Sequence, residues 1–185
     1  TIYRIIVSSV RYICSKDKDC AKSNNIKSLS FHIHHLYGNN ILKILHYALG
    51  FPPYRTGGLT KYCIDLMLTQ AEQGHEVALL WPGRITIVKK KPEIHKGRNW
   101  NGIESFEIIN PLPVPLDEGI LDVDAYIKKG DETVYSKFLQ DYSPAVSHIH
   151  TLMGLHKEFI PSSNEIGIRT VLTTHNYFGF CPKVT

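Results

Sequence analysis

The chain has 185 residues, enough to bury a core and within the usual size of one α/β domain. Its composition, 43% hydrophobic and 21% charged, excludes a mostly disordered protein. The formal net charge of +4 is too small to indicate nucleic acid as a partner, so no nucleic-acid binding is expected.

Residues 1–40 are expected to be a poorly structured or appended segment, because they lack the alternating strand and helix patterns of the rest. The apolar run Ile2–Val10 is interrupted by Arg4 and by serines, so it predicts neither a signal peptide nor a membrane span. The stretch 31–35, Phe-His-Ile-His-His, is weak evidence for a metal site because no carboxylate or Cys lies at ligand spacing. The four cysteines form no CxxC pair, which favours a reducing compartment and a cytoplasmic location.

Residues 41–185 carry the pattern of one α/β domain. The mostly apolar run Ile41–Leu49 predicts a buried parallel strand, and apolar residues at helical spacing after Gly57-Gly58 predict a helix that ends at Gly74. The apolar run 75–81 predicts a second strand. This part therefore predicts a βαβ unit with a right-handed crossover.

A hairpin is predicted next, because Asn101-Gly102 separates the apolar runs 94–100 and 103–109 and both turn residues accept a positive φ. A helix is predicted over 131–142, where Ser143-Pro144 ends it.

Two further strands, 145–150 and 169–174, flank a helix that is expected to begin near Leu152 and to break at Pro161. The fold class predicted for the chain is α/β: a Rossmann-like three-layer domain with a mainly parallel sheet, plus a β-hairpin.

The pair Gly57-Gly58 lies between a predicted strand and a predicted helix. Such a turn directs free backbone N–H groups, at the positive end of the helix dipole, towards an anion such as a phosphate. A simple tight turn explains the pair equally well. The chain contains neither a GxGxxG nor a Walker A sequence, which argues against nicotinamide and P-loop enzymes and against a nucleotide-sugar epimerase.

Histidines gather at the predicted carboxyl ends of the last two strands. His175 follows the strand 169–174, where open α/β sheets bind ligands, although a structural, hydrogen-bonded histidine would fit there equally well. His148 and His150 share one face of a strand, but no third zinc ligand is evident, so no metal is expected. We expect His148 to pack in the sheet and His150 to reach the crevice of His175.

Four segments in this order resemble family 4 glycosyltransferases, which have the GT-B fold. They are Ile44-Leu45-His46 leading to Phe51-Pro52-Pro53, Gly57-Gly58 with Gly74-His75-Glu76-Val77, His148-Ile149-His150-Thr151, and Thr174-His175-Asn176-Tyr177 through Cys181-Pro182. By this resemblance, residues 41–185 are the N-terminal, acceptor-side half of a GT-B enzyme.

The resemblance implies transfer of a sugar from a nucleotide diphosphate-sugar to an acceptor hydroxyl with retention, in polysaccharide or glycoconjugate biosynthesis and without a cofactor. Gly57 and Gly58 would approach the donor diphosphate. His175 would be the catalytic residue that contacts the transferred sugar, and His150, Asn176 and Tyr177 would shape the acceptor and sugar side. The family's second domain, whose glutamates hold the donor, has no counterpart here, so this part alone is expected to be inactive.

The chain also departs from the family pattern, since Asn176 and Ala145 stand where Asp is usual and Pro161 interrupts a usually continuous helix. The alternative is a non-catalytic module that binds a glycan or a membrane-linked acceptor. The basic segment Arg84–Arg98 is either a solvated loop or a contact with the inner face of a membrane.

Overall fold

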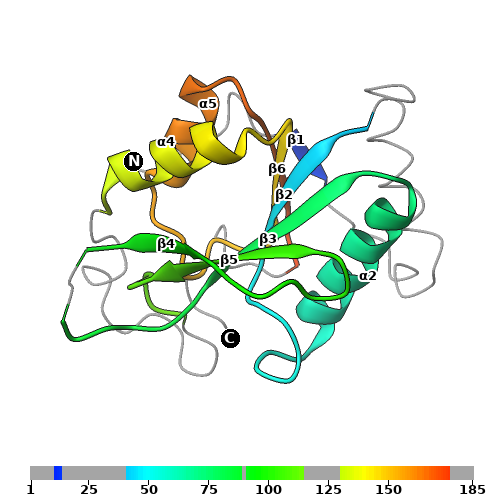
Figure 1. Ribbon diagram of the computed structural model, residues 1–185, viewed down its shortest axis with the longest axis horizontal. Helices are drawn as coiled ribbons and strands as arrows, with labels where there is room; N and C mark the ends of the chain where they lie inside the picture. Colours follow the sequence, from blue (N-terminus) through cyan, green and yellow to red (C-terminus); the bar gives the residue numbers. More distant parts are fainter. Residues whose placement is uncertain (1–10, 14–40, 89–90, 115–129, 176–185) are drawn as a thin grey trace.

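The computed structural model describes residues 11–13, 41–88, 91–114 and 130–175. Within them, seven strands form one sheet and three helices pack against it (Figure 1). The elements are β1 (Arg11–Ile13), β2 (Lys43–Tyr47), α2 (Gly58–Glu72), β3 (Glu76–Pro82), β4 (Glu93–Lys96), β5 (Glu104–Ile109), α4 (Glu132–Tyr142), β6 (Val146–Ile149), α5 (Phe159–Glu165) and β7 (Arg169–Thr173).

The sheet has the order β1-β7-β6-β2-β3-β5-β4, and every pair except β4 with β5 is parallel. Strand β2 has β3, the next strand of the parallel sheet along the chain, on one side and β6, a much later strand, on the other. The strand order therefore reverses between β2 and β6. In open α/β sheets, such a switch point is where the loops diverge and a ligand site forms.

The predicted βαβ unit is confirmed: β2, α2 and β3 follow one another, and Leu45 pairs in parallel with Ala78, next to Val77. Gly57, the residue before α2, has φ 113°, a conformation that glycine adopts readily. Gly74, with φ 88°, follows the last turn and lets the chain reverse into β3.

The predicted hairpin is also confirmed. β4 pairs antiparallel with β5, and the connecting Asn101 and Gly102 have φ 48° and 83°, both positive as the turn requires. An isolated bridge between Trp100 and Ile103 closes the turn.

Helix α4 has the predicted limits. The Asp131 side chain accepts a hydrogen bond from the Thr133 amide at the start of the helix, and Ser143, in the left-handed conformation, ends it before Pro144.

The predicted start of the next helix was wrong. Residues 151–158 form turns, and α5 begins only at Phe159. Pro161 lies in its first turn, where no intrahelical partner is needed for a backbone N–H, so the proline does not break the helix.

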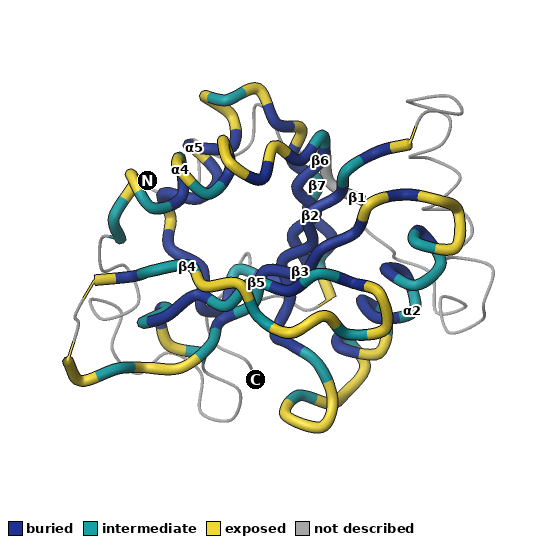
Figure 2. The backbone as a smooth tube through the Cα atoms, viewed as in Figure 1, coloured by how far each residue is buried: buried dark blue, intermediate teal, exposed yellow. Residues whose placement is uncertain are grey.

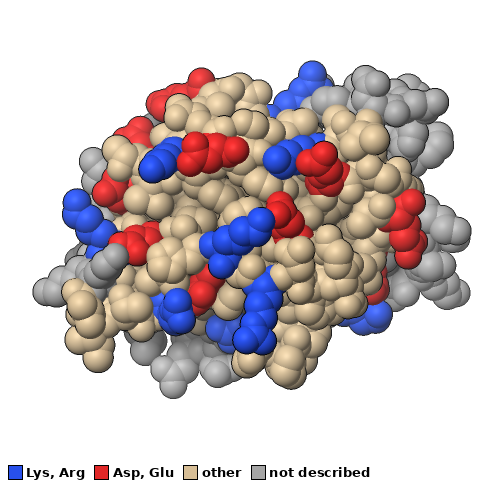
Figure 3. Space-filling view, in the orientation of Figure 1, with Lys and Arg blue, Asp and Glu red and all other residues tan. Residues whose placement is uncertain are grey.

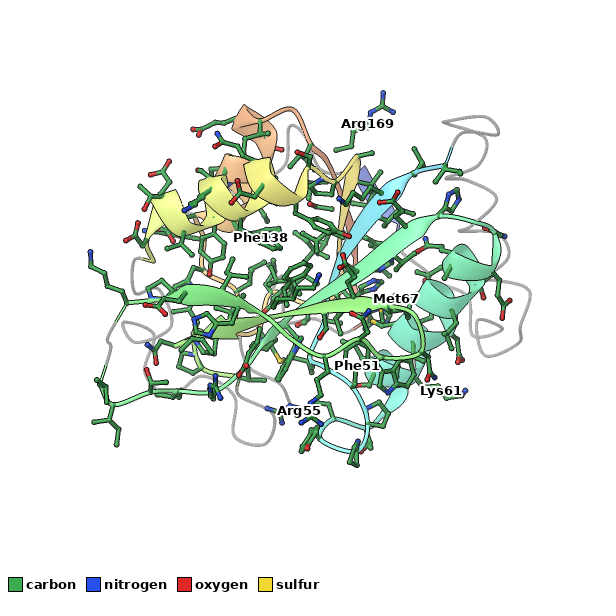
Figure 4. The ribbon with its side chains drawn as sticks, viewed as in Figure 1. Phe51, Arg55, Lys61, Met67, Phe138 and Arg169 are labelled. Carbon is green, nitrogen blue, oxygen red and sulfur yellow. The ribbon has the colours of Figure 1, made fainter. Side chains whose placement is uncertain are left out.

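The helices cover both faces of the sheet, which confirms a three-layer, Rossmann-like α/β arrangement. In Figure 1, α2 lies on one face, and α4 and α5 lie on the other. Strands β2, β3 and β6 form the buried centre in Figure 2. Figure 4 shows Met67 of α2 and Phe138 of α4 pointing into the two separate cores.

Of the segment 1–40, the structure describes only β1, which pairs in parallel with β7 at the edge of the sheet. The expectation of poor structure elsewhere in this segment concerns residues outside the described part. No helix in the described ranges is long and apolar enough to cross a membrane. On the face in Figure 3, acidic and basic side chains are interspersed.

Candidate functional site

The switch point between β2 and β6 is lined by histidines. His46 of β2 pairs with His148 of β6, and His150 follows β6 directly. Side chains two residues apart on a strand share a face, so His148 and His150 lie on the same side of the sheet, and His46 contacts the α2 residue Gln70 there. The histidines therefore lie under α2.

Three of these imidazoles and Gln70 form a continuous row. His46 Nε2 lies 2.7 Å from Gln70 Oε1, and His46 Nδ1 lies 2.9 Å from His150 Nε2. His150 Nδ1 then lies 3.5 Å from Nε2 of His175. Because the Gln70 oxygen only accepts, each nitrogen pair has one direction: His175 donates to His150, His150 to His46, and His46 to Gln70.

His148 lies beside this row rather than within it. Its ring centroid is 4.1 Å from that of His150 and 5.2 Å from that of His46. Its Nε2 is 2.8 Å from Thr173 Oγ1, while its buried Nδ1 has no hydrogen-bond partner. A buried polar atom without a partner is costly, so this nitrogen requires an explanation.

Burial keeps the histidines neutral. Loss of water around His46 lowers its pKa to about 4, and the bond to Gln70 only partly opposes this. Burial lowers the pKa of His148 and of His150 well below the usual value, with repulsion from the neighbouring histidines adding to the effect. At neutral pH each ring therefore has one N–H and one acceptor nitrogen.

His175 marks the outer end of the row. It is an exposed residue, yet its ring packs against His150 and against Tyr62 of α2, at centroid distances of 5.7 and 4.8 Å. This packing removes water from the ring, which lowers the pKa of His175. His175 can therefore act at neutral pH as an uncharged hydrogen-bonding group.

The start of α2 lies at the same edge of the sheet. The loop from β2 to α2 contains Phe51 and Arg55, which Figure 4 shows below the strands, while Arg169, at the start of β7, marks the opposite edge. A Cβ built on Gly57 or Gly58 would meet nothing within 4 Å. These two positions are thus open, as the proposed approach of an anion requires, and Tyr62 one turn later contacts His175.

The predicted site residues are only partly described. The structure brings His175 and His150 together at the carboxyl edge that also holds Gly57 and Gly58. His150 is only 1% exposed, so in this conformation it supports His175 rather than facing solvent. Asn176 and Tyr177 lie outside the described residues.

The sequence reasoning missed His46, Gln70 and Tyr62. Gln70 could have been noticed, because it is the one amide among the otherwise apolar or aromatic positions at helical spacing, 59, 62, 63, 66, 67 and 70. His46 could have been noticed too, as a histidine within an apolar strand. Their meeting with His148 and His150 depends on strand order, which local patterns do not contain.

The segment after β3 exposes apolar side chains. Ile85, Ile87 and Val88 are 78%, 96% and 94% exposed. Asn110 holds the segment at both ends: its Oδ1 accepts from the Thr86 amide at 2.7 Å, and its Nδ2 donates to the Lys91 carbonyl at 3.0 Å.

Comparison with known proteins gives no matching family model and no matching curated protein.

Proposed function

We propose that this chain is the N-terminal, acceptor-side domain of a retaining glycosyltransferase of the GT-B type, resembling family 4. The observation that carries the proposal is the position of His175, at the carboxyl end of β7 and in contact with α2 beside the switch point of the sheet. The substrates would be a nucleotide diphosphate-sugar and a glycan or lipid-linked acceptor.

The row of histidines supports a positioning role for its inner members. Gln70, buried under α2, sets the direction of the hydrogen bonds, so His175 donates from Nε2 to His150. Nδ1 of His175 is then the acceptor nitrogen. It would accept a hydrogen bond from a hydroxyl of the transferred sugar and hold the sugar in one orientation.

The start of α2 supports a role near the diphosphate. Charge builds on the diphosphate as the sugar departs, and backbone N–H groups at a helix N-terminus stabilise such charge without reorganisation. Gly57 and Gly58 leave room for this approach. The remaining donor contacts would come from a second domain, so the reaction needs both domains and no cofactor beyond the donor.

His175→Ala in a protein that includes the second domain tests this assignment. Turnover should fall by about a hundredfold or more, as expected for loss of a positioned group at the reacting centre. His95→Ala is the matched control, because His95 is an exposed histidine on β4, at the far edge of the sheet.

Thermal melting measured beside turnover separates this role from a structural one. A structural His175 predicts a lower melting temperature with turnover per folded molecule nearly unchanged. That result would remove His175 from the site.

A non-catalytic membrane-acceptor module is the second candidate, and the exposed segment after β3 favours it. The segment exposes the apolar side chains of Ile85, Ile87 and Val88, and the basic sequence Lys89-Lys90-Lys91 follows directly. Exposed apolar side chains next to basic ones suit an anionic membrane surface. Ile87→Asp with Val88→Asp should then abolish sedimentation with vesicles that contain anionic lipid. Equal sedimentation of the variant and the unchanged protein would exclude this contact.

A further inference from the structure

Three buried histidines at the switch point have the arrangement of an ion-binding site. His46, His148 and His150 are at most 1% exposed. Each offers one ring nitrogen, and these nitrogens lie within 4.8 Å of one another. Neutral imidazole is the form that binds metal ions, and burial holds all three rings in that form by lowering the pKa of each.

One nitrogen of each ring already has a neighbour outside the group of three histidines. His46 Nε2 is bonded to Gln70 Oε1, His148 Nε2 to Thr173 Oγ1, and His150 Nδ1 lies next to His175. Metal-binding histidines almost always use their second nitrogen in this way, which fixes the ring and its tautomer. The nitrogens left over are His46 Nδ1, His150 Nε2 and the unpartnered His148 Nδ1.

We propose that His46, His148 and His150 bind a divalent transition metal ion, with Zn²⁺ the best fit, through these three nitrogens. A set of three neutral imidazoles suits zinc and leaves the fourth position for water. The ion would give His148 Nδ1 the partner that it otherwise lacks.

The pair of His46 and His150 requires only a small movement, while His148, whose nitrogen lies within 4.8 Å of the other two, must move closer. Nitrogens bound to tetrahedral Zn²⁺ at about 2.0–2.1 Å lie roughly 3.4 Å apart. His46 Nδ1 and His150 Nε2 lie 2.9 Å apart while hydrogen-bonded. Binding therefore replaces their shared proton with the ion and separates the rings by about half an ångström.

Metal binding reverses one hydrogen bond in the row. With its Nε2 on the ion, His150 must have its proton on Nδ1 and becomes a donor to His175. In the metal-free row, His175 is the donor. With the ion bound, His175 Nε2 accepts and Nδ1 holds the proton, so Nδ1 would donate to a sugar hydroxyl instead of accepting from it. Binding of the ion does not itself depend on the proposed glycosyl transfer.

A second group of possible metal ligands also includes His150. Cys63, His150 and His175 also offer ligand atoms within 4.8 Å of one another. Cys63 binds an ion only as a thiolate, and burial raises the pKa of this thiol far above its usual value. The group of three histidines needs no such proton loss, so we assign the ion to it.

The experiment is a competition titration of the chelator-treated full chain with Zn²⁺ and with Co²⁺ as a spectroscopic probe. His148→Gln is the test variant, since glutamine can still reach Thr173 but lacks the Nδ1 ligand. His156→Gln is the matched control, because His156 is also buried but bonds to Tyr135 in the core under α4.

Two further variants test the alternative ligands. One changes His32, His34 and His35 to Gln and tests the other histidine-rich stretch, and Cys63→Ser tests the group of Cys63, His150 and His175.

One ion per chain is expected, with tetrahedral Co²⁺ absorption. His148→Gln should weaken Zn²⁺ binding by about a hundredfold or more, while the other three variants bind as the unchanged chain does. The proposal is overturned if the unchanged chain binds no more tightly than His148→Gln. Loss of binding in Cys63→Ser or in the His32/His34/His35 variant, with His148→Gln unaffected, also overturns it.

Circular dichroism checks that His148→Gln folds. If it does not, proton NMR of the Co²⁺-loaded unchanged chain decides the question. Strongly shifted ring N–H signals from three histidines that persist in the His32/His34/His35 variant support the site. Loss of these signals in that variant, or shifted Cys63 β-proton signals in their place, overturns it.

Discussion

Gln70 and His46 show how a buried polar pair can define a site from within the core. Both are fully buried, and the His46 N–H has the Gln70 oxygen as its acceptor. The bond offsets the cost of burying the His46 N–H and the Gln70 oxygen, although the buried Gln70 Nε2 has no hydrogen-bond partner. Removing one partner leaves the other unsatisfied. The two residues are thus coupled, although one is on a strand and the other on a helix.

Gln70→Leu should lower the free energy of unfolding by about 1–3 kcal/mol, because it leaves the buried His46 N–H without an acceptor. Urea denaturation measures the change. Glu72→Leu, at an exposed position of the same helix, is the control and should change stability by less than about 0.5 kcal/mol. Equal effects of the two substitutions would show that the hydrogen bond has no energetic role.

The buried histidines also predict a dependence of stability on pH in the metal-free chain. Their pKa values lie below the ordinary 6.5, near 4 for His46. As the pH falls below 6.5, these histidines bind protons in the unfolded chain but not in the folded chain. The free energy of unfolding is therefore highest above pH 6.5 and decreases towards pH 4.

Urea unfolding with chelator present, at several pH values between 7.5 and 4.5, measures this loss. Each histidine contributes about 1.4 kcal/mol per pH unit, so the three together should give a steeper slope than one. His148→Gln should reduce the slope. A stability that stays constant from pH 7 to pH 5 would contradict the burial of neutral histidines.

At the scale of elements, the helices and strands follow from local chemistry wherever that chemistry is strong. Asn101-Gly102 supplies both positive φ angles of the hairpin turn, and Asp131, at the start of the predicted helix, caps α4. Pro161 misled the prediction, because a proline in a first turn has the same local sequence as one that breaks a helix. Deciding between them requires the helix start, and no side-chain cap at Glu158 marks the start of α5.

The two glycines before and at the start of α2 should differ in their tolerance of a side chain. Neither Cβ would clash, but Gly57 has φ 113° and Gly58 is helical. Gly57→Ala should therefore cost about 1–3 kcal/mol of stability through backbone strain. Gly58→Ala should be neutral or slightly stabilising, because alanine favours the helix. Equal urea midpoints for the two variants would refute this difference.

At the scale of the whole molecule, the sequence predicted the layers but not the full strand order. Alternating strands and helices indicate a parallel sheet with helices on both faces, and the registers of β2 with β3 and of β6 with β7 confirm it. The pairing of β2 with β6 joins residues about a hundred positions apart. No local pattern predicts that pairing, and for this reason His46 was missed, while His150 and His175 could be proposed from the ends of their own strands.

The isolated chain should bind nucleotide diphosphate-sugars only weakly, because the proposal assigns most donor contacts to a second domain. Isothermal calorimetry with several such donors measures this. Tight binding by the 185-residue chain would overturn the division of the site between two domains.

The central proposal is retaining sugar transfer, and the stereochemistry of the product tests it most directly. A protein containing this domain and the second domain is incubated with a panel of nucleotide diphosphate-sugars and glycan or lipid-linked acceptors, and the first product is examined by proton NMR. We expect a new glycosidic bond with the same anomeric configuration as the donor. A product of inverted configuration, or a folded protein that binds donor and acceptor but forms no glycosidic bond, would contradict the proposal.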